Sequence, residues 1–341
     1  MKARSVVTLS DVAERAGVSL ATASRVINGG TRAVSPHYRD RVLAAAADLG
    51  YTPNAHAQAM ARGRSRIIGL VVHDIADPYF SAIAAGAISL AGSRGLLVLG
   101  NTLRSQASEL EYVTTMRAQR AQALILVGSR TTDDDYTRRL ADEVAEFIAG
   151  GGRVAVVGQD RLGADTVLPE NRAGARALAA ALIAQGHRRF AVLGGPTSLL
   201  TARHRVEGFE DGIAAHDLAP PVIVEGAFTR DGGFAAMGEL LDRAQDRDRS
   251  PCVFAVNDVM AIGAMAALRE RGLRVPADMA VAGFDDIPTL RDVAPSLTTV
   301  RLPLAEMGRL AASMVLDDGP GPTPRISSIE GEVVLRESTF R

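Results

Sequence analysis

The sequence of 341 residues contains one cysteine, no tryptophan and only 4% aromatic residues. A single cysteine, Cys252, excludes an internal disulfide framework and a zinc site built on several thiolates. The start of the chain lacks the apolar run of a signal peptide, and no apolar stretch of about 20 residues follows it. We therefore expect a protein of the cytoplasm without a membrane segment.

Signatures of catalysis are also lacking. The sequence contains no phosphate-binding G-x-x-x-x-G-K-[ST] loop, no G-x-G-x-x-G and no G-x-S-x-G motif. Its six histidines show neither H-x-x-x-H nor H-x-H spacing, and Cys252 lies inside an apolar run that is typical of a buried, inert thiol. Carboxylates are numerous, but nothing selects a catalytic pair. We expect no enzyme, no metal and no cofactor.

The charge is distributed unevenly along the chain. Residues 1–66 hold ten basic and four acidic residues, a net charge of +6, whereas the rest carries −7. A basic head on an acidic body indicates a polyanionic partner for the head alone. The remaining composition, 47% hydrophobic and 23% charged, is that of a globular protein. The length predicts two or three domains.

The head reads as three short helices over residues 9–16, 20–27 and 36–49. Thr8 and Asp11 have the spacing of a capping box, Gly17 ends the first helix, and Ser19 precedes the second. Two short helices joined by a glycine-containing turn form a helix-turn-helix. The expected core is small: Val12, Ala13, Ala16, Val18, Ala23, Val26, Val42, Leu43 and Leu49.

A linker over residues 53–65 follows the head. Only residues 55–61 favour a helix there, with Asn54 as its cap. Seven residues fall below the roughly 12–15 that an isolated helix needs in water. We therefore expect this segment to be helical only when another surface packs on it, and a plain flexible linker is the alternative.

From residue 66 onward, strands alternate with alanine-rich helices. The strand candidates form two sets: 67–73, 96–101, 123–128 and 154–159, then 190–194, 222–225, 252–257 and 279–284. Helices are expected over 78–93, 172–185, 203–216, 232–243, 259–271 and 304–316, and a last strand over 331–337. Alternating strands and helices predict parallel sheets with right-handed crossovers. The fold class is thus a small all-α head plus an α/β body of two doubly wound lobes.

Ligands of open parallel sheets bind beyond the carboxyl ends of the strands. Polar residues stand at these ends, and aromatic residues lie nearby: His73, Asp74, Asn101, Gln159, Asp160, Asn257, Asp258, Asp285 and Asp286, with Tyr79, Phe80, Phe228 and Phe284. Carboxylates, amides and aromatic faces in one cleft suit a small ligand with hydroxyl groups, such as a sugar. The alternative is that the acidic residues merely end strands and cap helices.

Several of these segments, taken in order, resemble the LacI/GalR family of transcriptional regulators. The resemblance rests on VTLSDVAERAGVS at 7–19, TASRVIN at 22–28, GYTPN at 50–54, DPYF at 77–80, EN at 170–171, RHRVEGF at 203–209, ND at 257–258, GFDD at 283–286 and LTTV at 297–300. It implies a DNA-binding domain (1–52), a hinge helix and linker (53–65) and a two-lobed effector-binding and dimerisation body (66–341), like periplasmic sugar-binding proteins. The first lobe is expected over about 66–161 and 296–325, and the second over about 162–295 and 326–341.

A helix-turn-helix places the start of its second helix in the major groove, which makes Leu20, Ala21 and Arg25 the candidates for base contacts. Arg25 can donate two hydrogen bonds to a guanine, whereas Leu20 and Ala21 offer apolar contact only. Together with the resemblance, this predicts DNA contacts from Thr8, Ser19, Leu20, Ala21, Thr22, Arg25 and Asn28, and from Asn54, Ala57 and Met60 in the hinge. Met60 stands where the family usually has Leu, and Gln58 where it commonly has Arg. A pseudo-palindromic operator is implied.

For the effector, the resemblance implies contacts from Arg203, Asn257 and Asp285, and also from Asp160 and Phe228. Tyr79 and Phe80 follow the first strand and are expected to line the same cleft. Leu302 stands where many relatives have Gln, which removes an amide from that position.

The expected function is a sequence-specific repressor whose operator affinity is controlled allosterically by a sugar or related metabolite. The expected assembly is a homodimer, without a tetramerising tail. Effector binding would change the orientation of the lobes and so the pairing of the hinge helices, as inducer or as corepressor. Three alternatives remain: a sugar receptor without DNA function, an enzyme with an attached DNA-binding head, and a regulator that answers to a partner protein. The basic head opposes the first, and the absent catalytic motifs oppose the second.

Overall fold

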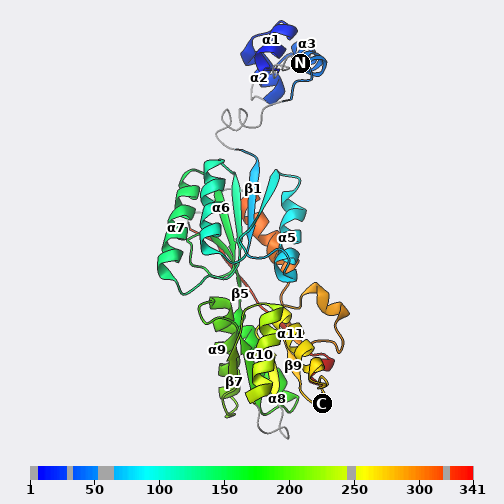
Figure 1. Ribbon diagram of the computed structural model, residues 1–341. Helices are drawn as coiled ribbons and strands as arrows, with labels where there is room; N and C mark the ends of the chain where they lie inside the picture. The colour runs from blue at the N-terminus through cyan, green and yellow to red at the C-terminus, as the bar shows by residue number, and fades with distance from the viewer. Residues whose placement is uncertain (1–6, 29–33, 53–64, 244–250, 318–322, 341) are drawn as a thin grey trace. The chain divides into compact units, whose positions relative to one another are not determined.

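The computed structural model describes residues 7–28, 34–52, 65–243, 251–317 and 323–340. The chain divides into two compact units, Met1–Arg66 and Ile67–Arg341. Figure 1 shows the helices of the first unit and the strands and helices of the second. Each unit is described by itself below.

Within its described residues, the first unit contains three helices: α1 (Leu9–Ala16), α2 (Leu20–Asn28) and α3 (Pro36–Leu49). The predicted capping box is confirmed, because the Thr8 N–H donates to Asp11 at 2.8 Å and the Asp11 N–H donates to the Thr8 hydroxyl at 3.4 Å. Gly17 ends α1 with φ 62°, and a Cβ there would lie 2.6 Å from the Arg41 guanidinium. The turn into α2 therefore requires glycine because of its positive φ, whereas the Arg41 side chain could move away from a Cβ atom.

The core of this unit differs from the expected one at two positions of α3, because Ala45 is buried and Leu43 is not. Its fully buried members are Val12, Ala13, Ala16, Ala23, Val42 and Ala45. Leu43 is 46% exposed, so its placement in the core was wrong. The buried side of α3 follows positions 42, 45, 46 and 49, and Leu43 is turned about 100° from Val42.

The second unit has two lobes, each built on a parallel sheet, as predicted. The first lobe has a six-stranded sheet in the order β11-β5-β4-β3-β1-β2. Its strands are β1 (Ile67–Val72), β2 (Leu96–Asn101), β3 (Ala123–Val127), β4 (Arg153–Val157), β5 (Asp165–Pro169) and β11 (Ile326–Ile329). Its helices are α5 (Pro78–Ala91), α6 (Gln106–Ala118), α7 (Asp134–Ala149) and α12 (Leu304–Leu316).

Successive residues of these strands lie alternately on the two faces of the sheet, and in the central strands the side chains on both faces are buried. Ile125 and Val127 of β3 belong to the core that includes residues of α5 and α12, whereas Leu124 and Leu126 belong to the core of α6 and α7. This period of two, with both faces apolar, explains why the strands read as continuous hydrophobic runs.

The second lobe has a four-stranded parallel sheet in the order β7-β6-β8-β9. Its strands are β6 (Phe190–Gly194), β7 (Val222–Glu225), β8 (Cys252–Ala255) and β9 (Val281–Ala282), and its helices are α8 (Asn171–Ala184), α9 (Leu200–Ala214), α10 (Arg230–Arg243) and α11 (Asp258–Glu270). Helices α8 and α9 pack together, as do α10 and α11. No helix in the described ranges is long and apolar enough to cross a membrane.

The chain passes from one lobe to the other three times. These passages lie at other residues than expected, so the expected lobe boundaries were wrong. The passages follow β5, β10 (Thr299–Arg301) and β11, and β10 pairs antiparallel with β12 (Glu332–Val334). Strands β5 and β11 pair with each other and β5 with β4, so both belong to the first lobe and not to the second. These strands escaped prediction because β11 reads ISSI, half of it polar and partly exposed, which gives no buried-strand signal.

Candidate functional site

The start of α2 carries the predicted base-reading residues on the surface of the first unit. Leu20 is 51% exposed, and Ala21 and Arg25 are exposed as well. Ala21 and Arg25 are four residues apart and so share one helix face. The Ser19 hydroxyl accepts from the Thr22 N–H at 3.2 Å and lies 2.9 Å from the Thr22 hydroxyl, which fixes the first turn.

The other predicted DNA contacts are less open to a partner or lie outside the described residues. Thr8 is exposed, and its side chain is committed to the cap with Asp11. The Asn28 amide donates to the Ser24 hydroxyl at 3.0 Å at the far end of α2. Asn54, Ala57 and Met60, with the hinge helix to which they were assigned, lie outside the described residues.

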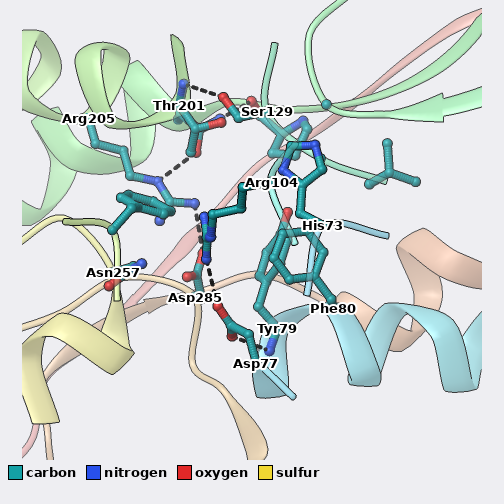
Figure 2. Close-up of a pocket in the computed structure, with 16 residues that line it drawn as sticks. His73, Asp77, Tyr79, Phe80, Arg104, Ser129, Thr201, Arg205, Asn257 and Asp285 are labelled. Carbon is teal, nitrogen blue, oxygen red and sulfur yellow. Dashed lines mark hydrogen bonds and ion pairs between the residues drawn. The ribbon is translucent and has the colours of Figure 1, made fainter. Parts of the chain in front are cut away.

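A pocket lies between the two lobes of the second unit, at the carboxyl ends of their strands. Figure 2 shows residues from both lobes pointing into it. Its lining is His73, Asp77, Tyr79, Phe80, Arg104, Gly128, Ser129, Val157, Gly158, Pro169, Asn171, Thr201, Arg205, Phe228, Asn257 and Asp285. This is where the topology of doubly wound sheets puts ligands. Five of the seven predicted effector residues line it: Tyr79, Phe80, Phe228, Asn257 and Asp285.

Arg205, on α9, organises the second-lobe wall of the pocket. Its guanidinium donates to Asp285 at 2.7 Å, to Asn171 at 2.7 Å and to the Val256 carbonyl at 2.8 Å. The side chain is only 2% exposed, so these three bonds and the charge of Asp285 replace the water that burial removes.

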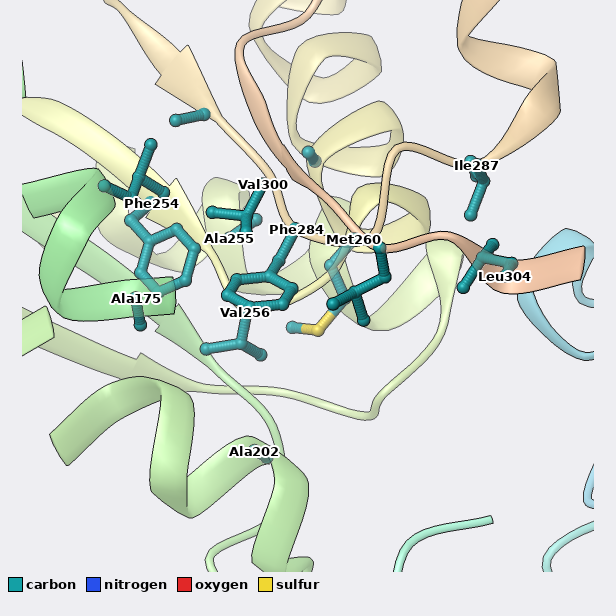
Figure 3. Close-up of a cluster of buried hydrophobic side chains, with 14 of the residues drawn as sticks. Ala175, Ala202, Phe254, Ala255, Val256, Met260, Phe284, Ile287, Val300 and Leu304 are labelled. Atoms are coloured by element: carbon teal, nitrogen blue, oxygen red, sulfur yellow. The ribbon is translucent and has the colours of Figure 1, made fainter. Parts of the chain in front are cut away.

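The ring of Phe284 supports this guanidinium from one side. The Arg205 Cζ atom lies 3.9 Å from the ring centroid, within the range of a cation–π contact. Figure 3 shows Phe284 among Val256, Met260 and Val300, which are all fully buried. The guanidinium is therefore packed on an apolar surface that fixes its position at the pocket wall.

Asp285 is the carboxylate of this wall and has a strained backbone. Its φ of 120° lies in the left-handed region. Burial raises the pKa of Asp285 to about 6, although the Arg205 cation opposes that rise. At neutral pH the carboxylate is thus mainly ionised and paired.

The first-lobe wall holds a second ion pair, and one aromatic ring from each lobe lies near it. Arg104 lies 3.5 Å from Asp77, and its Cζ atom lies 5.9 Å from the centroid of Phe80 and 5.6 Å from that of Phe228. Because Phe228 belongs to the second lobe, Arg104 contacts both walls, and Figure 2 shows its side chain near the centre of the pocket. Burial lowers the pKa of His73 to about 4, so this imidazole is neutral.

Two predicted effector residues do not line the pocket. Arg203 is 44% exposed and pairs with Glu207 at 3.5 Å, and Asp160 is exposed. Arg205, and not Arg203, reaches the pocket because two residues correspond to about 200° on a helix, which turns Arg203 to the opposite face. The motif RHRVEGF contains both arginines, so its sequence alone did not separate them.

His73, expected at the end of the first strand, lines the pocket, whereas Asp77 and Arg104 were not expected there. Asp77 caps α5, where its carboxylate accepts from the Tyr79 N–H at 3.0 Å. Arg104 lies in a loop with φ 63°, which no periodic pattern reveals. Leu302 is 3% exposed and does not line this pocket.

Comparison with known proteins agrees with this architecture. Residues 8–54 match the bacterial regulatory proteins of the lacI family, and residues 179–339 match the periplasmic binding protein-like domain. The transcriptional regulator GalS of Salmonella typhimurium is 36% identical over 331 residues, which cover 93% of this chain and 91% of GalS. This chain belongs to the LacI family of bacterial transcriptional regulators.

Two solved structures of LacI-family regulators extend the similarity to the whole fold. The lac repressor dimer bound to operator and the anti-inducer ONPF is 29% identical and has a TM-score of 0.82, covering 99% of this chain and 100% of that chain. The CelR–cellobiose complex is 33% identical with a TM-score of 0.69, covering 97% and 99%. The resemblance and the fold class inferred from the sequence are thereby confirmed, and the family function is DNA-binding regulation of transcription.

Proposed function

We propose that this LacI-family regulator is a cytoplasmic, homodimeric repressor whose operator affinity is controlled by a small neutral sugar or related polyol. The ligand binds in the pocket between the lobes. The observation that carries this proposal is the buried Arg205–Asp285 pair, which together with Asn171 and Asn257 presents donors and acceptors at a pocket wall.

The charges of the pocket favour a neutral ligand. Two cations, Arg104 and Arg205, face two carboxylates, Asp77 and Asp285, and His73 is uncharged. An ionic ligand would leave one charge unpaired in a buried site, which is costly. Hydroxyl groups can donate to the carboxylates and accept from the guanidiniums without changing this balance.

The aromatic rings favour a ligand with an apolar face. Phe80 and Phe228 come from opposite lobes, and the centroids of their rings lie 5.9 Å and 5.6 Å from the Cζ atom of the Arg104 guanidinium. Pyranose rings combine an apolar C–H face with polar edges, so such a ligand satisfies both the rings and the ion pairs. The cellobiose in the CelR complex is a ligand of this chemistry in a relative of the same fold.

The DNA half of the proposal rests on the exposed start of α2. Leu20, Ala21 and Arg25 are exposed there and would read bases, and Ser19 and Thr22 at the helix N-terminus would contact a phosphate. Two such heads in a dimer would bind a pseudo-palindromic operator. The hinge assigned to residues 53–65, with Asn54, Ala57 and Met60, would connect effector binding to DNA binding.

The coupling is a population shift between two lobe orientations with unequal effector affinity. Ser129 and Thr201 show how one orientation is held, because the Thr201 N–H donates across the lobes to the Ser129 hydroxyl at 3.1 Å. A ligand that prefers this orientation stabilises it, and the sign of the response on DNA then depends on which orientation pairs the hinges.

The test is a panel of neutral mono- and disaccharides, including cellobiose, added to the full chain. A ligand should raise the melting temperature and shift operator binding, measured by fluorescence anisotropy, in wild type and in Arg203→Gln. The same ligand should change neither the melting temperature nor the operator binding of Asp285→Asn. If no neutral carbohydrate in the panel changes either quantity while a partner protein does, the proposal is wrong.

A further inference from the structure

A second hollow lies beside the interlobe passages, separate from the effector pocket. Its empty volume is about 990 Å³, part of it open to solvent. It is lined by Asp286, Ile287, Pro288, Leu290, Arg291, Val293, Ser296, Arg301, Leu302 and Arg336. These residues come from the loop after β9, the short helix η2 (Pro288–Asp292), β10 and the segment after β12.

The charge of this lining differs from that of the effector pocket. Three guanidiniums, Arg291, Arg301 and Arg336, face one carboxylate, Asp286. Beyond the lining, Glu332 pairs with Arg301 at 3.1 Å, and the Glu337 carboxylate accepts from the Ser296 N–H at 2.9 Å. Arg291 is the cation that these carboxylates leave uncompensated, because within the described ranges it makes no side-chain hydrogen bond or ion pair.

The other two guanidiniums keep donors available. Arg301 uses Nε on Asp286 at 2.7 Å and Nη1 on Glu332, while Arg336 uses Nη2 on Asp286 at 2.7 Å and Nη1 on the Leu297 carbonyl at 2.9 Å. A guanidinium carries five N–H donors, so Nη2 of Arg301 and Nε of Arg336 have no partner among the described residues. Planar forks of this kind match phosphate and carboxylate oxygens.

We propose that this hollow binds a compact dianion of the phosphate class, either inorganic phosphate or the phosphate group of a phosphomonoester. Asp286, Glu332 and Glu337 offset much of the charge of the lining arginines, so the attraction for a phosphomonoester, which carries a charge of about −1.5 to −2 at neutral pH, rests on Arg291, which has no ion pair within the described ranges. Arg291 supplies the uncompensated charge, and Arg301 and Arg336 supply oriented donors.

The position of the site connects it to the effector pocket. Asp285 and Asp286 are adjacent residues with φ 120° and 54°, and their carboxylates point to different hollows. Asp285 pairs with Arg205 in the effector pocket, and Asp286 pairs with Arg301 and Arg336 in the second hollow. A dianion that competes with Asp286 for these arginines thus acts on the residue next to a pocket carboxylate.

The binding test does not depend on the proposed effector. Full-length protein is titrated with inorganic phosphate, with glucose 6-phosphate and with glucose at constant ionic strength, while the melting temperature and the ³¹P line width are followed. Both phosphates should give saturable stabilisation and broadening. Arg291→Gln, which breaks no described bond, should weaken this binding by at least about tenfold.

The matched control is Arg269→Gln, which removes an exposed cation at the end of α11 and should leave phosphate binding unchanged. If Arg291→Gln binds phosphate like wild type, the ion sits elsewhere, for example on the basic head, and the proposal is overturned. Saturable binding of glucose 6-phosphate that survives Arg291→Gln and is matched by glucose would instead place the ligand in the effector pocket. Absence of saturable binding of either phosphate would also overturn it.

Discussion

The guanidinium of Arg205 combines two roles that usually exclude each other, since it is fully buried and yet faces a pocket. Its three hydrogen bonds and the ring of Phe284 hold it in one position at the pocket wall. A ligand can therefore gain affinity only by contacting atoms that are already oriented, which reduces the ordering cost of binding. The same arrangement makes the folded protein depend on this one side chain.

Replacing Arg205 with Met should lower the free energy of unfolding by about 3–5 kcal/mol, because it leaves Asp285 buried without its partner. Arg203→Met, on the same helix, should cost less than about 1 kcal/mol, since its ion pair is exposed. Urea unfolding of both variants measures the difference. Equal losses would contradict the assignment of Arg205 to the buried pair.

Arg25→Ala should remove base discrimination at one position of each operator half-site, worth about 1–3 kcal/mol. Arg15→Ala is the control: Arg15 is an exposed arginine of α1, 3.9 Å from Asp48, and it lies outside the base-reading face. Competition binding with single-base operator variants measures the sequence preference of Arg25→Ala and of Arg15→Ala. An unchanged sequence preference in Arg25→Ala would refute the role of Arg25.

The pocket was predictable from the sequence where strand ends supplied polar residues, and less so elsewhere. Asn257 and Asp285 follow β8 and β9, so topology places them at the pocket. Arg203 and Arg205 point to opposite sides of α9, and the sequence motif that contains both does not show which of them faces the pocket. Arg104 depends on a loop with positive φ, a conformation that is rare for arginine and that no local signal announces.

At the scale of elements, helix α12 joins the first lobe through close backbone contact with α5. Gly308 of α12 faces the Ile83 carbonyl oxygen, and Gly86 of α5 faces the Ala305 carbonyl oxygen, both at distances that exclude a Cβ atom. This contact holds α12, which directly follows β10 in the chain, against the first lobe.

Gly308→Ala should therefore destabilise the protein by roughly 1–3 kcal/mol, because the helices must move apart. Gly238→Ala in α10 is the matched control, since an added Cβ there meets nothing closer than 4.0 Å. That variant should gain about 0.5–1 kcal/mol from helix propensity. Thermal unfolding of Gly308→Ala and Gly238→Ala tests this contact. An equal loss of stability in both variants would contradict it.

The first turn of α11 holds the passage that leads into β10. Asp258 is fully buried and accepts from the Thr299 hydroxyl at 2.7 Å and from the Ile287 N–H at 2.9 Å. Burial, with the nearby charges of Asp285 and Asp286, raises the pKa of Asp258 from 3.8 to about 7. The folded protein thus retains a proton that the unfolded chain releases near pH 4.

Because the folded pKa exceeds the unfolded one, stability from this group falls as pH rises from about 4 to about 7 and is level above that. Asp258→Asn removes the titration, so the stability of the variant relative to wild type should increase by about 2–4 kcal/mol over that range. Chemical unfolding at pH 4, 5.5 and 7 measures it. A pH-independent difference between the two proteins would show that Asp258 is not buried as described.

Elements with a strong apolar pattern were predicted closely, and those without it were not. The expected helix over residues 304–316 coincides with α12, and the strand candidates 190–194 and 222–225 coincide with β6 and β7. Strand β5 (Asp165–Pro169) begins with two polar residues and ends in proline, and β11 pairs, among the described strands, only with β5, about 160 residues away in sequence. Long-range pairing of short, half-polar strands leaves no local signature.

For the whole molecule, the division into a basic head and an acidic two-lobed body followed from charge and periodicity alone. The lobe boundaries did not, because the chain passes between the lobes three times and each passage is short. The proposed homodimer needs exposed apolar residues at its interface, and the sequence pattern alone does not distinguish such residues from those of the core. In the structure, Ile88 on α5 and Leu96 and Leu99 on the edge strand β2 are 45%, 65% and 42% exposed.

An exposed edge strand with large apolar residues favours association, so we expect the dimer to use this face of the first lobe. Leu96→Lys combined with Ile88→Glu should convert the dimer to a monomer in sedimentation velocity and weaken operator binding by at least about 100-fold, because two half-sites are no longer bound together. Ile326→Lys is the control, since Ile326 is 53% exposed on β11 at the opposite edge of the same sheet. A dimer that survives the double substitution but not Ile326→Lys would place the interface at that opposite edge, and a monomeric wild type would exclude the dimer altogether.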